Sequence, residues 1–324
     1  MVKIQEFQQI INDLIEKQDF AKSPTELYEP ICYVMSQEGK RLRPLLTLLA
    51  CDLFDGDIQQ ALYPAMAIEV FHNFTLVHDD IMDNAPLRRG KETVYKKWNS
   101  NIAILAGDTM FAMAYQYAVK TDPGLIPDIL GVFSQAAIEV CEGQQLDMNF
   151  ENTEKVTIDD YLNMIRLKTA VLLGASLKIG AIAAKADPES VKDIYQFGIH
   201  LGIAFQLKDD LLDVFGNEEK FGKKSGGDIV ANKKTYLYLK ARELADQLQL
   251  NELSILYKSQ PEDPKEKIIK VKQLFNDLGI EACVSNVMEE YYEKSLEFLD
   301  AVNADKDKKA ALRTFAEQLY HRVH

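Results

Sequence analysis

The chain has 324 residues, of which 47% are hydrophobic and 27% are charged, and its formal net charge is −13. This composition is typical of a folded globular protein, and the length is sufficient for a large buried core. The excess of acidic residues argues against a nucleic-acid ligand, which requires clustered Lys and Arg, and against attachment to an anionic membrane surface.

The N-terminal segment MVKIQEFQQIINDL is amphipathic, carries Glu6 and Asp13, and lacks the apolar core of a signal peptide. The most apolar stretch, residues 170–186, contains Lys178 and is too short to span a membrane. The four cysteines form no C-x-x-C pair, which indicates neither a zinc site nor a disulfide framework. We therefore expect a cytoplasmic protein without stable membrane insertion, whose cysteines are buried thiols.

Helical periodicity runs through nearly the whole chain, since apolar residues recur at spacings of three and four and no stretch alternates long enough to indicate a strand. Proline and glycine in residues 121–128, 186–190 and 258–267 predict turns between helices. The Gly- and Lys-rich residues 216–228 predict a mobile loop. Because no segment resembles an interdomain linker, the sequence predicts one all-α domain over residues 1–324.

The first acidic motif, HDDIMD, ends an apolar helical segment, AIEVFHNFTLVH. On a helix Asp79 and Asp83 share one face, and Asp80 lies about 100° around the axis. Because this helix should be largely buried, a cluster of acids at its end needs a counter-charge. Carboxylate oxygens with room for water suit Mg²⁺, which bridges one or two carboxylates to substrate phosphates.

The second acidic motif, QLKDDLLDVFG, repeats this spacing at Asp209, Asp210 and Asp213 after another apolar helical segment. A single DDxxD is more often structural than functional, but two copies that each end an apolar helix are a much stronger signal. They predict two walls of carboxylates that face each other across a cavity and hold metal ions between them. Such ions would chelate a highly charged anion, for which diphosphate is the natural candidate.

Basic residues accompany both acidic motifs. One such residue alone indicates no more than a surface charge, but together with the acids they predict a site for two polyphosphates, one bound by metal and one held directly by Arg and Lys. These residues are Lys40, Arg41 and Arg43 in EGKRLRP, Arg88 and Arg89 after the first motif, Lys168 beside Thr169 in an apolar helix, and Lys223 and Lys233 around the second loop. The segment GNEEKFGKK is not a P-loop, because it has one residue too many between its glycines and lacks Ser or Thr after the lysine.

In their order and spacing, these motifs resemble those of trans-isoprenyl diphosphate synthases of the polyprenyl synthetase family. The resemblance runs nearly end to end, through GKRLRP, HDDIMD with LRRG, AILAGD, GQQLD, RLKTA, FQLKDDLLD, GKKSGGD and KKT. It implies an all-α helical bundle around a deep central cavity, the isoprenoid synthase fold, usually as a homodimer. It also implies a Mg²⁺-dependent prenyltransferase that condenses isopentenyl diphosphate head-to-tail with an allylic diphosphate to make a short-chain all-trans prenyl diphosphate.

The resemblance also implies roles for particular residues. Magnesium ions, three with substrate bound, would be held chiefly by Asp79, Asp83 and Asp209, with Asp80, Asp210 and Asp213 in support. Isopentenyl diphosphate would be held by Lys40, Arg43, His72 and Arg89. The allylic diphosphate would be held by Arg88, Lys168, Lys223 and Lys233, and Thr169 and Gln206 would face the carbocation that forms when it leaves.

The implied chemistry is ionisation of the allylic diphosphate, attack by the double bond of isopentenyl diphosphate, and loss of a proton. Metal ions and pre-placed cations would stabilise the leaving diphosphate, and residues 216–228 would close over the site to exclude water. No side chain is an obvious general base, and in this family the released diphosphate is thought to take the proton. Among the few departures from the family pattern, Asn232 stands where a glycine commonly precedes the lysine.

The residues before the first acidic motif give an indication of product length. Phe74 and Thr75 precede Asp79 by five and four positions, a pattern that resembles geranylgeranyl-forming members of the family. We therefore predict a C20 product, with C15 and C25 as alternatives. On an ideal helix Phe71 lies about 80° from Asp79, so it is a second candidate for the floor of the cavity. Both phenylalanines could instead be ordinary core residues.

Three other functions remain open from the sequence. A terpene cyclase shares the fold, but usually replaces the second aspartate cluster with an Asn/Ser/Glu motif. A non-catalytic partner subunit commonly loses aspartates or arginines that are present here. An acidic helical scaffold that binds divalent ions does not explain why basic residues accompany both acidic clusters.

Overall fold

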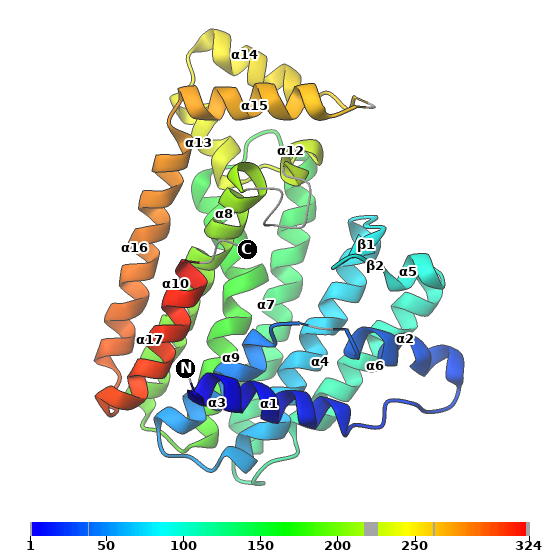
Figure 1. Cartoon of the computed structure of the whole chain (residues 1–324), viewed down its shortest axis with the longest axis vertical. Helices are drawn as coiled ribbons and strands as arrows, with labels where there is room; N and C mark the ends of the chain where they lie inside the picture. The colour runs from blue at the N-terminus through cyan, green and yellow to red at the C-terminus, as the bar shows by residue number, and fades with distance from the viewer. Residues whose placement is uncertain (1, 38, 217–225, 262, 322–324) are drawn as a thin grey trace. The chain divides into compact units, whose positions relative to one another are not determined.

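The computed structural model describes residues 2–37, 39–216, 226–261 and 263–321. These residues are helical except for loops and one short antiparallel hairpin of β1 (Leu87–Arg88) and β2 (Lys91–Glu92) (Figure 1). The all-α prediction is therefore confirmed. The part of the chain that is described contains no helix long and apolar enough to cross a membrane.

The chain divides into two compact units. Unit 1 comprises Met1–Gln135, Ala175–Ile194 and Val302–Leu312, and unit 2 comprises Ala136–Gly174, Tyr195–Ala301 and Arg313–His324. Helices α7 (Ile126–Asn152), α9 (Val171–Ala183), α10 (Pro188–Phe215) and α17 (Lys306–Tyr320) contribute residues to both. The single domain expected from the sequence stays a prediction.

Unit 1 is built around α4, which is buried on most of its surface. The helices of this unit are α1 (Val2–Glu16), α2 (Thr25–Met35), α3 (Leu42–Leu53), α4 (Ile58–Met82), α5 (Val94–Lys97) and α6 (Ser100–Ala118). Helix α4 packs against α3 and α6, and its side chains from Ala61 to Val77 supply much of the core. Asp57 begins the helix by accepting the N–H of Gln59. The burial predicted for the segment before the first acidic motif is confirmed.

Unit 2 contains six complete helices among the described residues. They are α8 (Ile158–Ile165), α12 (Gly227–Val230), α13 (Tyr236–Leu244), α14 (Gln247–Leu256), α15 (Lys265–Asp277) and α16 (Ile280–Ala301). Capping boxes begin two of these helices, Thr157 with Asp160 at α8 and Asp246 with Gln249 at α14. Between α8 and α9 the chain forms one π-helical turn, η1 (Arg166–Ala170), which the sequence pattern did not predict.

The three predicted turns are confirmed, since they separate α6 from α7, α9 from α10, and α14 from α15. Of the predicted loop over residues 216–228, residues 217–225 lie outside the described residues, and its last two residues already belong to α12. The expectation that all cysteines are buried is wrong. Cys51 is buried, but Cys141 occupies an exposed position on α7.

Candidate active site

The first acidic motif lies at the C-terminal end of α4 in unit 1. Asp79 is half-buried and Asp83, at the helix end, is exposed. Asp80 is buried, and its Oδ1 accepts a hydrogen bond from Arg88 Nε at 2.8 Å. Burial raises the pKa of Asp80, and the bond to Arg88 opposes that rise. The three aspartates therefore differ in their surroundings. Asp80 is bound by Arg88, and Asp79 and Asp83 lie together on another face of the helix.

The hairpin after α4 explains how LRRG positions its arginines. Leu87 pairs with Glu92 and Arg88 with Lys91, which leaves a two-residue turn of Arg89 and Gly90. Both turn residues have positive φ, 52° and 76°, as a type I′ turn requires. Glycine adopts this conformation without strain. The turn directs Arg88 back to Asp80 and places Arg89 where burial lowers its pKa and Glu69 opposes the change.

Two further arginines meet the middle of α4. Arg43 Nη1 donates a hydrogen bond to His72 Nε2 at 3.1 Å. The pKa of His72 is held well below its usual value by burial and by the positive charges of Arg43 and Arg89. A neutral imidazole can accept the bond, so in this structure His72 orients Arg43. Direct contact of His72 with a substrate diphosphate stays a prediction.

Arg41 has a structural role, which its position in the motif does not indicate. It adopts φ 45° ahead of α3 and is buried. Its guanidinium donates to Glu69 Oε1 at 2.5 Å and to the carbonyls of Met35 and Gln37 at 2.9 and 2.7 Å. Asn73 also donates to Glu69. Arg41 thereby fixes the loop that carries Lys40 and leads into α3, in whose first turn Arg43 lies.

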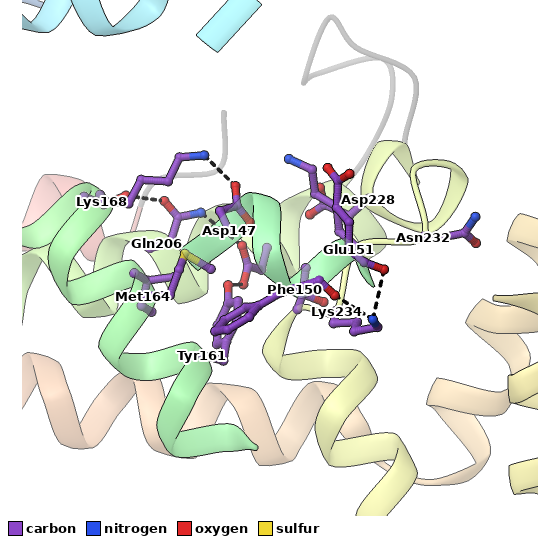
Figure 2. Close-up of a pocket in the computed structure, with 15 residues that line it drawn as sticks. Asp147, Phe150, Glu151, Tyr161, Met164, Lys168, Gln206, Asp228, Asn232 and Lys234 are labelled. Atoms are coloured by element: carbon purple, nitrogen blue, oxygen red, sulfur yellow. Dashed lines mark hydrogen bonds and ion pairs between the residues drawn. The ribbon is translucent and has the colours of Figure 1, made fainter. Parts of the chain in front are cut away.

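Unit 2 contains a polar pocket of about 100 Å³ (Figure 2). Its lining includes five predicted site residues, Lys168, Thr169, Gln206, Asp210 and Lys233. The volume is below the ≈ 300–1,000 Å³ of pockets that enclose a whole small molecule. The pocket therefore fits the charged head of a ligand rather than a complete prenyl diphosphate.

The π-helical turn η1 presents two of these residues to the pocket. Lys168 Nζ lies 2.6 Å from Asp147 Oδ2 on α7, and Thr169 Oγ1 donates to Gln206 Oε1 at 3.0 Å (Figure 2). A π-turn widens the helix by one residue and is frequent at functional sites. Here it places two consecutive residues in separate contacts, one with α7 and one with α10.

A buried chain of hydrogen bonds continues from Gln206. Gln206 Nε2 donates to Asp210 Oδ1 at 3.1 Å, and the hydroxyl of Tyr161 donates to Asp210 Oδ2. Burial and the charge of Asp228 raise the pKa of Asp210 well above its usual value. Asp210 is thus an acceptor within a buried network, with Tyr161 and Gln206 on its two oxygens.

Asp228 and Asp213 form the acidic edge of the same region. Asp213 Oδ2 accepts the N–H of Asp228 at 3.0 Å, so Asp213 anchors the start of α12. Burial and the nearby charge of Asp213 raise the pKa of Asp228 to about 6. Asp209 lies half-buried on α10.

The predicted residues thus fall into two groups. Unit 1 holds the first motif together with Lys40, Arg43, His72, Arg88 and Arg89, and unit 2 holds the second motif with the pocket residues. That the two acidic motifs face each other across a cavity stays a prediction. Lys223 lies outside the described residues.

A family model described as polyprenyl synthetase matches residues 24–277, which is more than half of the chain. The chain belongs to the polyprenyl synthetase family. It is similar to a geranylgeranyl diphosphate synthase of Sulfolobus acidocaldarius, with 37% identity over 92% of this chain and 90% of the relative. A geranylfarnesyl diphosphate synthase of Natronomonas pharaonis is 39% identical over 74% of this chain and 76% of its own. Among solved structures, a geranylgeranyl pyrophosphate synthetase from Pyrococcus horikoshii matches with a TM-score of 0.92 and 34% identity over 99% of this chain and 98% of its own.

The pocket of this polyprenyl synthetase contains residues that the sequence analysis did not predict as site residues. Asp147 and Asp228 were visible only as the last letters of GQQLD and GKKSGGD, and Tyr161 carried no motif signal of its own. Lys234 also lines the pocket, and its Nζ donates to the carbonyls of Phe150 and Thr153 at 2.6 and 2.7 Å, at the end of α7. The only available signal was position, since each lies within or beside a family motif.

Proposed function

We propose that this polyprenyl synthetase is a Mg²⁺-dependent trans-prenyltransferase that joins isopentenyl diphosphate head-to-tail to an allylic diphosphate. The observation that carries the proposal is the pocket in unit 2, where Lys168, Thr169 and Gln206 converge beside acidic residues. The names of the relatives support the reaction class, because they make geranylgeranyl and geranylfarnesyl diphosphates. A C20 product is the one that we favour.

For isopentenyl diphosphate, the protein supplies positive charges that bind and position the substrate. Arg43, oriented by neutral His72, and Lys40, carried on the loop that Arg41 fixes, offer donors for a diphosphate. Arg89 in the hairpin turn contributes a third positive charge. Arg43 is half-buried, and partial burial strengthens its interaction with an anion because the surroundings screen charge less than water does.

On the allylic side, Lys168 and Lys233 line the pocket that would receive the diphosphate head. Thr169 Oγ1 and Gln206 are held by the network that ends on Asp210 and Tyr161. Their oxygens can face a developing carbocation without reorganising, which is how preorganised dipoles lower a barrier. Asp147 holds Lys168 in place until the anion arrives.

The acidic residues fit magnesium by their chemistry. Among the described residues no three His, Cys, Asp or Glu side chains form a site that could hold an ion unaided, and Mg²⁺ commonly relies on one or two carboxylates plus substrate phosphates. Asp79, Asp83 and Asp209 offer such carboxylates. When bound, the ions supply Lewis-acid stabilisation of the leaving diphosphate. The homodimer and the count of three ions belong to the same proposal.

The test is to incubate the protein with farnesyl diphosphate, isopentenyl diphosphate and Mg²⁺ and to size the product by mass spectrometry. We expect a C20 diphosphate that disappears when EDTA removes the metal. Asp79→Asn and Asp209→Asn should fold normally and lose turnover by at least about 100-fold, because removing such stabilisation costs at least about 3 kcal/mol. A cyclised hydrocarbon would instead indicate a cyclase, and metal binding without product would indicate a scaffold.

A further inference from the structure

Residues 226–235 include five residues of the pocket lining, Asp228, Asn232, Lys233, Lys234 and Thr235. They rest on a helix that contributes none of the lining residues. That helix is α15, which packs against α12. At the start of the segment Gly226 has φ +87°, and a Cβ there would lie 3.0 Å from two side-chain carbons of Ile268. The segment therefore begins in close contact with α15.

A second contact with α15 is made at Asn232. Lys267 Nζ donates to Asn232 Oδ1 at 2.5 Å and to the carbonyl oxygen of Ser259 at 3.0 Å. Lys267 is 3% exposed, and lysine is rarely so buried unless its ammonium group is satisfied. Burial lowers its pKa. Asn232 is among the residues that line the pocket, and in Figure 2 its side chain points away from Asp228.

Asn232 adopts an uncommon backbone conformation, with φ 56°. Asparagine tolerates this left-handed region better than most residues, but glycine adopts it at no steric cost. The hydrogen bond from Lys267 restrains the asparagine side chain, and with it the left-handed turn.

The turn at Asn232 determines where Lys233 goes. Lys233 N donates to the carbonyl of Asp228 at 2.9 Å, which closes the turn. On the other side Lys234 is tied to the end of α7 by its bonds to Phe150 and Thr153. Lys233, between these two restraints, lines the pocket.

We propose that Lys267 is a positioning residue for the allylic-diphosphate site, acting through Asn232 to fix the backbone from which Lys233 reaches the pocket. The hydrogen bond from Lys267 anchors the side chain of Asn232 at this left-handed turn. The proposal rests on the proposed function for the assignment of Lys233 to the allylic diphosphate.

The experiment measures the KM of each substrate for Lys267→Met, Asn232→Gly and the double variant. We expect Lys267→Met to raise the KM for the allylic diphosphate about tenfold, equivalent to about 1.4 kcal/mol, with the KM for isopentenyl diphosphate within about twofold. Residues that act as a pair are non-additive, so in the Asn232→Gly background the same substitution should change the allylic KM by less than about threefold. Lys270→Met is the matched control, because Lys270 lies exposed on the same helix and pairs with Glu266.

A second comparison holds even if Lys267→Met does not fold. Asn232→Ala loses both the anchor and the tolerance for positive φ, so its allylic KM should exceed that of Asn232→Gly. Stabilisation of each variant by inorganic diphosphate with Mg²⁺, read as a shift in Tm, provides a measure independent of turnover. Equal changes in both KM values, or independent effects in the double variant, would overturn the inference. Absence of product from the wild-type protein would instead overturn the proposed function.

Discussion

At the scale of single residues, the two groups of cations should be separable by kinetics. Arg43→Ala and Lys40→Ala should raise the KM for isopentenyl diphosphate by about 10- to 100-fold, because each removes a charge-assisted contact worth about 1.5–3 kcal/mol. Lys233→Ala should act mainly on the allylic substrate. Steady-state kinetics with each substrate varied separately measures this, and Lys91→Ala, at an exposed position of the hairpin, is the control. A reversed pattern would mean that the two diphosphate sites are exchanged.

Asp228 should make stability depend on pH. Its pKa rises from 3.8 to about 6 on folding, so between these values the folded state binds more protons than the unfolded state. Stability conferred by this group is therefore complete below about pH 4 and decreases as the pH rises through 6. In metal-free buffer, the Tm of the wild-type protein relative to that of Asp228→Asn should be lower at pH 7 than at pH 4. A difference that stays constant with pH would contradict the raised pKa.

At the scale of elements, α3 and α4 are joined by the buried pair Arg41–Glu69, with side chains 7% and 4% exposed. Arg41→Met should destabilise the protein by about 3–5 kcal/mol, because it leaves the Glu69 charge buried with only Asn73 as a described donor. Arg41→Met combined with Glu69→Leu should recover much of that loss, since replacing both partners removes the unpaired charge. Urea unfolding measures both variants. Additive losses in the double variant would show that the pair is not coupled.

The elements also show where the sequence pattern was insufficient. Periodicity and Pro/Gly boundaries predicted the long helices and the turns between them, because those features depend on neighbours three or four residues apart. The π-turn at Lys168 was not predictable, since its residues have ordinary helical character. It arises where α8, α9 and their neighbours must pack together, and that constraint is not visible in a local window.

At the scale of the whole molecule, we expect product length to depend on an aromatic cluster drawn from three helices of unit 1. Phe71 is fully buried, with ring centroids 5.5 Å from Phe74 and Phe133 and 5.9 Å from Phe111. Phe74 is only half-buried, so a prenyl tail along α4 would meet Phe74 before Phe71. Thr75 donates to the His72 carbonyl and adds little bulk.

Phe74→Ala should therefore lengthen the product by one five-carbon unit, from C20 to C25, with little loss of stability. Phe71→Ala should instead cost about 3–5 kcal/mol, as expected for a phenylalanine removed from a packed core. Mass spectrometry of the products and urea unfolding test the two expectations. If neither substitution lengthens the product, the tail does not run along this face of α4 and both phenylalanines are core residues.

The sequence by itself determined the all-α class, the turns at residues 121–128, 186–190 and 258–267, and the family. Each of these depends on local periodicity or on motifs of a few adjacent residues. The tertiary structure decided which charged side chains are bound by other residues of the protein, and which residues those partners are. Asp80 binds Arg88, Lys168 binds Asp147, Tyr161 binds Asp210, and Lys267 binds Asn232. The last three partners lie 21, 49 and 35 residues apart. Contacts over such distances exist only after helices pack, because packing places side chains from separate helices within hydrogen-bond range, and no local pattern in the sequence encodes that choice of partner.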